Sequence, residues 1–267
     1  MRDLGGRVAI VAGASGGIGS ATVRAMLARG MRVVAAAPDD ALLDALAAEL
    51  HAYGDRALIV PADITQRADV DLVAARTLVA FGRIDALANV AGVGSGPSFC
   101  DATDAEIERV FAVNLLGAAR LMHAVLPAMK AQREGAIVNV GSVAGEAAVM
   151  GAYSGSKFGL RGLNDSVRRE VRRYGIGVTL VQPGFVATRM NASMANLPGP
   201  EIVADAIVGA LQRPRRSIIV PASYRLPVFL ITRFPALADL VFGNARIQDR
   251  LNRDARAERA RAGGETG

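Results

Sequence analysis

A glycine-rich turn between a short apolar strand and a helix is the feature that most constrains how this 267-residue chain can fold. Residues 7–12 have the pattern of a buried strand and residues 17–29 that of a helix, and glycines stand at positions 13, 16, 17 and 19. Glycine lets the backbone approach a ligand closely, and a helix start offers free N–H groups and partial positive charge. The segment therefore predicts a phosphate-binding turn, although a tight turn without a ligand would use the same glycines.

A tyrosine and a lysine four positions apart, Tyr153 and Lys157, point to chemistry. Only Lys130 and Lys157 are lysine among the 31 basic residues, which indicates that position 157 needs a compact ammonium group rather than a guanidinium. Spacing i,i+4 on a helix places the two side chains side by side. Because a nearby cation favours phenolate, we expect the pKa of Tyr153 to fall toward the range useful for proton transfer. A surface pair on an amphipathic helix is the alternative.

Short β-branched runs alternate with amphipathic stretches through the first two hundred or so residues, which is typical of a parallel α/β sheet. The expected strands are 7–12, 32–36, 57–60, 85–89, 136–140, 177–181 and 217–220. The expected helices are 17–29, 40–53, 68–80, 103–131, 152–173 and 201–212. We therefore predict a single-domain, Rossmann-like, doubly wound parallel sheet of about seven strands, with helices on both faces, over residues 1–221.

A C-terminal extension over residues 222–267 is expected to differ from this domain. Residues 224–242 are apolar, but prolines and charged residues interrupt them, so they form one or two helices rather than a membrane span. Residues 243–267 form a polar, arginine-rich tail. The apolar segment either covers a substrate cleft or a subunit interface, or makes a peripheral membrane contact as an apolar face followed by a basic segment.

Five further motifs accompany the glycine turn and the Tyr–Lys pair. They are Asp63-Ile64, Asn89-Val90-Ala91-Gly92, Asn114 within residues 113–117, Ser142 within residues 140–145, and residues 183–188. With its motifs in this order, the chain resembles the short-chain dehydrogenase/reductase family from residue 6 to about residue 221. The resemblance implies an NAD(P)-dependent oxidoreductase that transfers a hydride between nicotinamide and an alcohol or carbonyl substrate.

The resemblance also implies roles for individual residues. Tyr153 would be the general acid in reduction and the general base in oxidation, and Lys157 would lower its pKa and hydrogen-bond the nicotinamide ribose. Ser142 would hold the substrate oxygen against Tyr153, and Asn114 would anchor a water chain that leads to Lys157. The implied cofactor-binding residues are Gly13, Ser15, Gly17, Ile18, Gly19, Asp63, Ile64, Asn89, Gly92, Tyr153, Lys157, Pro183, Gly184 and Thr188. Of these, Asp63 and Ile64 would lie near the adenine.

The expected cofactor is NAD or NADP. Ala37 stands where NAD-preferring relatives carry Asp, and neither Pro38 nor Gly16 offers a cation for a 2′-phosphate. Asp39 and Asp40 are close enough to repel that phosphate or to receive a ribose hydroxyl. These features leave both cofactors open.

The chain departs from the family pattern at three points. Ala12 and Val90 replace the usual Thr and Asn, which removes one supporting contact in each case. The interval from Ser142 to Tyr153 is eleven positions, about two shorter than in similar proteins. Residues 146–150 must therefore close a shorter turn and reshape one wall of the substrate cleft.

The expected substrate is a lipophilic alcohol or ketone. Met190 and Met194 lie in a short loop, residues 189–197, of the kind that closes over a substrate. Adaptable methionines and the apolar segment 224–242 favour a lipophilic small molecule over a charged sugar.

Composition limits the remaining functions. With only His51 and His123, widely separated, no metal site is expected. The net charge of +6 comes without interleaved aromatic residues, so no nucleic-acid partner is expected. A single cysteine, Cys100, and the absence of a signal segment favour a cytoplasmic location.

Assembly and activity have alternatives. In similar proteins the long helices that here carry Asn114 and Tyr153 form the pairing surface, which implies a homodimer or homotetramer. A non-catalytic nucleotide-binding or regulatory protein could use the same fold. Such a protein would have no need of Asn114, Ser142, Tyr153 and Lys157 together, which favours the enzyme.

Overall fold

Seven parallel strands form one sheet in the order β3-β2-β1-β4-β5-β6-β7. They are β1 (Val8–Ala12), β2 (Arg32–Ala37), β3 (Ala57–Pro61), β4 (Ala86–Asn89), β5 (Gly135–Val140), β6 (Ile176–Pro183) and β7 (Ser217–Val220). Strand β1 pairs with β2 on one side and with β4 on the other. Strands β2 and β3 therefore extend the sheet in one direction from β1, and strands β4 to β7 extend it in the other. The predicted doubly wound sheet is confirmed, and its switch point lies between β1 and β4, where such sheets bind ligands.

The computed structural model describes residues 3–38, 40–94, 99–192 and 194–244, together with Ile247 and Asp249. Asp39, one of the two acidic residues expected near the cofactor ribose, lies outside the described residues. So does nearly all of the basic tail 243–267.

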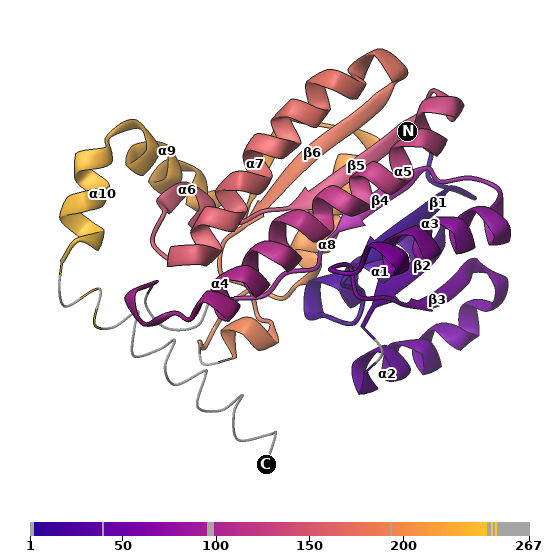
Figure 1. Ribbon diagram of the computed structural model, residues 1–267, viewed down its shortest axis with the longest axis horizontal. Coiled ribbons are helices and arrows are strands. Elements are labelled where there is room, and N and C mark those ends of the chain that lie inside the picture. Colours follow the sequence, from indigo (N-terminus) through magenta and orange to yellow (C-terminus); the bar gives the residue numbers. More distant parts are fainter. Residues whose placement is uncertain are drawn as a thin grey trace.

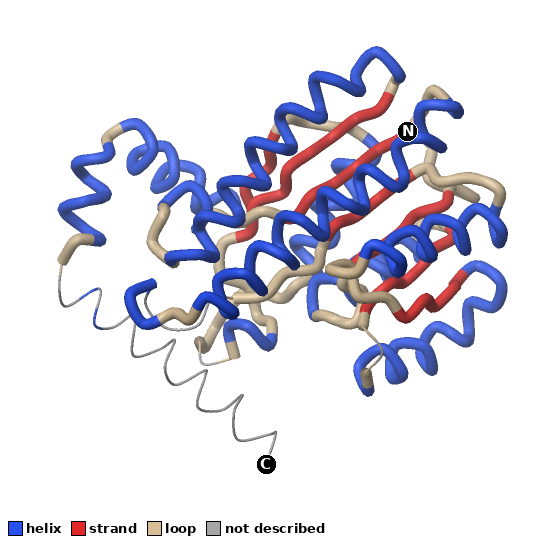
Figure 2. The backbone as a smooth tube through the Cα atoms, viewed as in Figure 1, coloured by secondary structure: helices blue, strands red, loops and turns tan. Residues whose placement is uncertain are grey.

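Helices cover both faces of the sheet (Figure 1), and the strands lie between them (Figure 2). One face carries α1 (Gly17–Ala28), α2 (Ala41–Leu50) and α8 (Glu201–Gln212). The other carries α3 (Arg67–Phe81), α5 (Ala118–Gln132) and α7 (Gly151–Val171). Successive strand side chains point to opposite faces, so Ala9 and Val11 pack in the first layer while Ile10 and Ala12 pack in the second. Short 3₁₀ helices occupy His51–Arg56, Phe99–Asp101, Arg172–Tyr174, Arg189–Asn191 and Ala222–Tyr224.

The helix expected over residues 103–131 contains a local change of winding. It consists of α4 (Asp104–Phe111), a π-helical segment (Ala112–Gly117) and α5, with Asn114 in the π-helical part. Single π-helical turns inside α-helices occur often at functional sites, because the extra residue redirects a side chain. By length and composition Asp104–Gln132 could cross a membrane. Its residues Leu121, Val125 and Met129 are buried against the sheet, however, so it serves here as a core helix.

The apolar segment 224–242 forms two helices after β7, α9 (Arg225–Arg233) and α10 (Pro235–Phe242). Both lie at one end of the molecule, and α9 packs against the short helix α6 (Ala144–Ala147) (Figure 1). Just before α9, the ring of Tyr224 covers Gly184, where a Cβ would overlap it. The extension is therefore anchored beside the segments that follow β5 and β6.

Candidate active site

A cavity of about 560 Å³ opens at the carboxyl ends of the central strands. Its walls come from the segments that directly follow β1, β4, β5 and β6, together with the start of α7. The parallel sheet brings these segments together although Gly13 and Asn191 are 178 positions apart in the chain. Most of the residues expected to bind cofactor or substrate line it, namely Gly13, Ser15, Gly17, Ile18, Gly19, Gly92, Ser142, Tyr153, Lys157, Pro183, Gly184 and Thr188.

The turn after β1 is built so that only glycine fits at two of its positions. Gly13 has φ of +81°, and a Cβ there would lie 2.5 Å from the backbone N and Cα of Ala91. A Cβ on Gly19 would overlap the carbonyl of Gly13. The turn therefore packs tightly against the loop that follows β4, residues 90–94 (the β4 loop). It leaves the first N–H groups of α1 facing the cavity, as phosphate binding requires. The residues present thus fit a dinucleotide.

Tyr153 and Ser142 both line the cavity and contact each other. The Ser142 hydroxyl hydrogen-bonds the phenol of Tyr153 and accepts a 3.1 Å hydrogen bond from the N–H of Ala144. Burial raises the pKa of Tyr153, and the hydrogen bond from Ser142 lowers it by less. The expected fall in this pKa is therefore wrong for the protein without cofactor, because the loss of hydration around a buried phenolate is the larger effect.

Lys157 lies on the same face of α7 as Tyr153, as the spacing predicts, and is 4% exposed. Its Nζ is 5.7 Å from the centre of the Tyr153 ring and donates a 2.9 Å hydrogen bond to the carbonyl of Val140. Burial lowers the pKa of Lys157 to about 8. A cation that is itself close to losing its proton stabilises phenolate only weakly, so Lys157 does not offset the effect of burial on the pKa of Tyr153.

Asn114 does not line the cavity but supports its wall. Its amide accepts a 2.8 Å hydrogen bond from the N–H of Val93 and donates one of 2.9 Å to the Val93 carbonyl, and it also donates to Ser156 at 3.1 Å. A Cβ on Gly92 would lie 3.2 Å from Lys157 Nζ and 3.4 Å from Asn114 Oδ1. The absence of a side chain at Gly92 therefore lets both the Asn114 amide and the Lys157 ammonium lie close to this part of the backbone.

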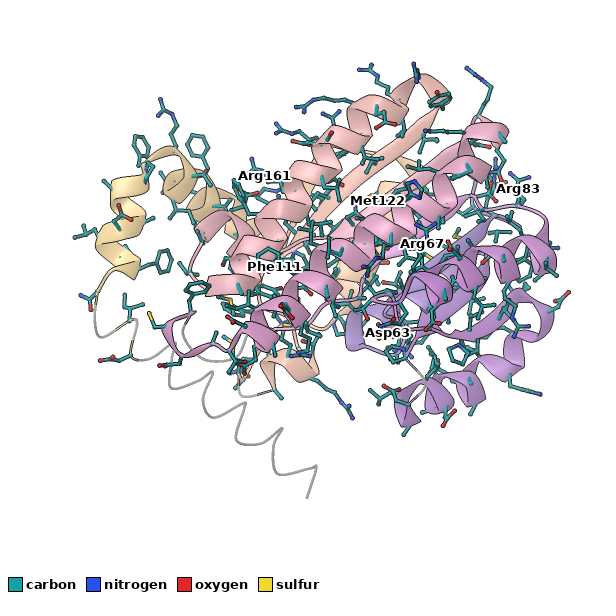
Figure 3. The ribbon with its side chains drawn as sticks, viewed as in Figure 1. Asp63, Arg67, Arg83, Phe111, Met122 and Arg161 are labelled. Carbon is teal, nitrogen blue, oxygen red and sulfur yellow. The ribbon has the colours of Figure 1, made fainter. Side chains whose placement is uncertain are left out.

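Three expected cofactor residues are not brought into the cavity. Asp63 accepts a 2.8 Å hydrogen bond from the N–H of Thr65 in the turn before α3 (Figure 3), and Ile64 packs in the core layer of α3 and α5. Asn89 is buried and donates to the side chain of Asn139 at 2.8 Å. A place near the adenine stays a prediction for Asp63 and Ile64.

Comparison with known proteins identifies the family to which the chain belongs. The model of the short chain dehydrogenase family matches residues 7–197. The chain belongs to the short-chain dehydrogenase family. It is 34% identical over 221 residues to an uncharacterized oxidoreductase of Staphylococcus haemolyticus, covering 80% of this chain and 94% of that protein. It is 37% identical over 197 residues to a 3-oxoacyl-[acyl-carrier-protein] reductase of Synechocystis, covering 73% of this chain and 80% of that protein.

A solved structure extends the likeness to three dimensions. The short-chain dehydrogenase/reductase of Burkholderia phymatum in complex with NAD has a TM-score of 0.83 at 28% identity, covering 89% of this chain and 96% of that one. This short-chain dehydrogenase is accordingly an oxidoreductase of CH–OH or C=O groups that uses NAD or NADP.

Sequence reasoning missed part of the dehydrogenase cavity. Leu42, Val93, Val113 and Val140 also line it, but each has only the pattern of an ordinary core residue. Asp40 accepts hydrogen bonds from the N–H groups of Leu42 and Leu43 and thereby caps α2. An acidic residue directly before an apolar helical run is a recognised capping signal, and it could have shown that Asp40 already has a partner.

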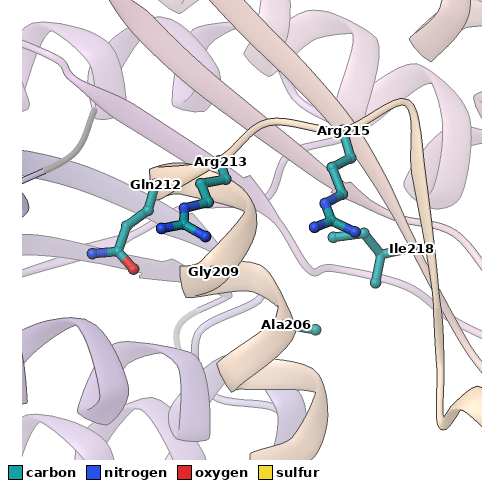
Figure 4. A pocket seen from close by; sticks show the side chains of 6 residues that line it. All are labelled: Ala206, Gly209, Gln212, Arg213, Arg215 and Ile218. Atoms are coloured by element: carbon teal, nitrogen blue, oxygen red, sulfur yellow. The ribbon is translucent and has the colours of Figure 1, made fainter.

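A second cavity of about 910 Å³ lies apart from this site, between the C-terminal half of α8 and β7. Its lining residues are Ala206, Gly209, Gln212, Arg213, Arg215 and Ile218. In Figure 4 the side chain of Arg213 extends toward Gln212, and that of Arg215 extends toward Ile218. This cavity lies at the amino end of β7 and shares no lining residue with the cavity of Tyr153. Over the described part of the chain, no group of three His, Cys, Asp or Glu side chains is placed to hold a metal ion.

Proposed function

We propose that this dehydrogenase interconverts a lipophilic ketone and its alcohol, with Tyr153 as the general acid and base. The observation that carries the proposal is a buried phenol, hydrogen-bonded to Ser142 and next to Lys157, in the cavity that the glycine turn also lines. When bound, the nicotinamide supplies or accepts the hydride.

The proton is handled by this chain's own side chains. In reduction the neutral Tyr153 gives its proton to the oxygen that gains negative charge, and Ser142 holds that oxygen in place. The raised pKa keeps Tyr153 protonated at neutral pH, which suits this direction. Lys157, with a pKa of about 8, is poised to return a proton, and Asn114 holds the β4 loop against it.

A titration tests the cofactor and the catalytic residue together. Purified protein is titrated with NADH and NADPH while the fluorescence of the reduced nicotinamide is followed, and micromolar binding of at least one is expected. Tyr153→Phe should still bind the same cofactor with micromolar Kd and lose about a thousandfold in kcat. Binding without turnover on any substrate would instead favour a nucleotide-binding protein without activity.

The rim of the cavity supports a lipophilic substrate. Phe185 and Met190 are each 37% exposed, Met194 is 42% exposed and Phe99 is 60% exposed. Met190 lines the cavity, Phe185 follows Gly184, and Phe99 contacts the first residue of α7. We infer that 3-oxoacyl thioesters, the substrate class named for the Synechocystis relative, belong in the first panel with long-chain and cyclic ketones. Preference for small polar carbonyls would contradict this assignment.

The protein is further proposed to be a cytoplasmic homodimer or homotetramer paired through its long helices. Leu116, 47% exposed, and Phe158, 59% exposed, are the large apolar side chains that α7 and the π-helical segment leave uncovered. Light scattering should give a mass of two or four chains for the wild type and a smaller one for Phe158→Ser.

Peripheral membrane contact through α9 and α10 is a separate proposal. Leu226 is 64% exposed, Phe229 59%, Phe234 52% and Leu240 76%, and the exposed Arg225 and Arg233 frame α9. Apolar side chains flanked by arginine suit a surface of anionic lipids. The double variant Leu226→Ser/Phe229→Ser should sediment less with phosphatidylglycerol vesicles than the wild type. Val79→Ser, which removes an 87% exposed apolar residue on α3, is the matched control, and equal sedimentation of all three would contradict the contact.

A further inference from the structure

The segment between Ser142 and Tyr153 rests directly on the helix that carries the tyrosine. It forms α6, turns through Ala148 with φ of +53°, and enters α7 at Gly151. A Cβ on Gly145 would lie only 3.1 Å from Lys157 Cβ and 3.2 Å from the backbone nitrogen of Phe158. Because Tyr153 comes only eleven positions after Ser142, this close packing leaves little slack in the segment.

One hydroxyl joins the two ends of this segment. Ser154 donates a 2.8 Å hydrogen bond to the carbonyl of Ala144 and accepts one of 3.0 Å from the N–H of Met150. The side chain is 4% exposed, so water does not compete for these bonds. Ala144 in turn donates its N–H to the Ser142 hydroxyl. Ser154 is thus connected through a single residue, Ala144, to the Ser142 hydroxyl that contacts Tyr153.

An ion pair braces the same segment from outside. The carboxylate of Glu146, in α6, accepts a hydrogen bond from Arg161, which lies one turn beyond Lys157 on α7 (Figure 3). The Glu146 side chain is 6% exposed and that of Arg161 is 37% exposed. The ion pair fixes the distance between α6 and α7, and the hydrogen bond from Ser154 to Ala144 fixes the position of α6 along the axis of α7.

We infer that Ser154 is a positioning residue, which holds the Ser142 hydroxyl against the Tyr153 phenol through the backbone of Ala144. This assignment rests on the proposed catalytic role of Tyr153 and Ser142. It also accounts for how a shortened segment can keep Ser142 in place. The hydrogen bond from Ser142 is the contact that lowers the pKa of Tyr153. Loosening it should therefore raise that pKa further.

Ser154→Ala tests the inference, with Ser166→Ala as the matched control, because Ser166 is an exposed serine on the same helix. Ser154→Ala should lower kcat roughly 10- to 100-fold and leave the Kd for the reduced cofactor within twofold. The pH at which alcohol oxidation reaches half its maximum should move upward, because the base form of Tyr153 is then harder to reach. A merely structural role would not move the pH profile.

A double-mutant cycle gives the decisive measurement. If Ser154 acts through Ser142, adding Ser154→Ala to Ser142→Ala should lower the residual kcat less than twofold. Full additivity, or an unchanged kcat in Ser154→Ala, would overturn the inference. Should Ser154→Ala not fold, Ser154→Cys keeps the volume with a weaker donor and is expected to give the same pattern. Unchanged turnover in Ser142→Ala and Tyr153→Phe would mean instead that the proposed function has failed.

Discussion

The ammonium of Lys157 donates a 2.9 Å hydrogen bond to the main-chain carbonyl of Val140, the last residue of β5. The bond ties the middle of α7 to the end of the central sheet. It also leaves a cation almost without access to water, since Lys157 is 4% exposed. Burial of this kind costs stability and is tolerated where a charge is used.

Replacing Lys157 by Met should therefore stabilise the protein at neutral pH while removing activity. The pKa is lowered from 10.5 to about 8, so the cost of the buried cation is fully present below pH 8 and is relieved between pH 8 and 10.5. At 1.36 kcal/mol per pKa unit that cost is about 3 kcal/mol, from which the lost hydrogen bond subtracts about 1 kcal/mol. Urea unfolding without cofactor should show Lys157→Met more stable at pH 7, with a smaller gain at pH 10. Lower stability at both pH values would contradict the prediction.

The phenol of Tyr153 should stay protonated at higher pH than an ordinary tyrosine in water. Its pKa is raised by burial, against a smaller lowering by Ser142. The chain has four tyrosines and no tryptophan, so absorbance at 295 nm can follow their ionisation. The absorbance of the wild type minus that of Tyr153→Phe reports Tyr153 alone, and this difference should rise only above pH 10. A midpoint below 10 in the free protein would show that Lys157 outweighs burial.

The glycine turn offers a matched pair of variants. Gly13→Ala places a methyl group 2.5 Å from the Ala91 backbone at φ of +81°, and we expect it to lose roughly 2–4 kcal/mol of stability. Gly16→Ala has φ of −74°, and its nearest atom, the Gly13 carbonyl oxygen, is at 3.5 Å. It should change stability by less than about 0.5 kcal/mol. Equal losses in thermal unfolding would show that the turn can relax.

At the amino ends of the central strands, Asp85 holds the starts of β1 and β4 together. Its buried carboxylate accepts hydrogen bonds from Arg7, Arg83 and the N–H of Val8. Burial alone would raise the pKa of Asp85, but these hydrogen bonds outweigh it and the pKa is lowered. The stabilisation is therefore present at neutral pH and is lost as pH falls below about 4.

Asp85→Asn should accordingly lower the free energy of unfolding by roughly 2–4 kcal/mol at pH 7, with kcat per folded molecule unchanged. Between pH 5 and pH 3 the wild type should lose more stability than the variant, because the variant has no proton to take up at this position. Parallel pH curves would indicate that Asp85 contributes nothing through its charge.

The strands and helices could be predicted closely because their signal is local. The expected strand over residues 32–36 is observed as Arg32–Ala37, and the expected helix 201–212 as Glu201–Gln212. Strand alternation and helical periodicity depend on which face is buried, and that is written into neighbouring residues. The π-helical segment around Asn114 has no such signal. Only packing against the β4 loop and Ser156 shows why the winding changes there.

The sequence by itself determined the doubly wound sheet, the glycine turn and the pairing of Tyr153 with Lys157 on one helical face. These follow from periodicity, from backbone freedom at glycine and from a fixed rise per residue. Only the tertiary structure decided the direction of the Tyr153 pKa and the bracing of the Ser142 segment by Ser154. Each of these depends on hydration and hydrogen bonding around the group. Those surroundings are assembled by residues distant in the chain or by backbone geometry that periodicity does not encode.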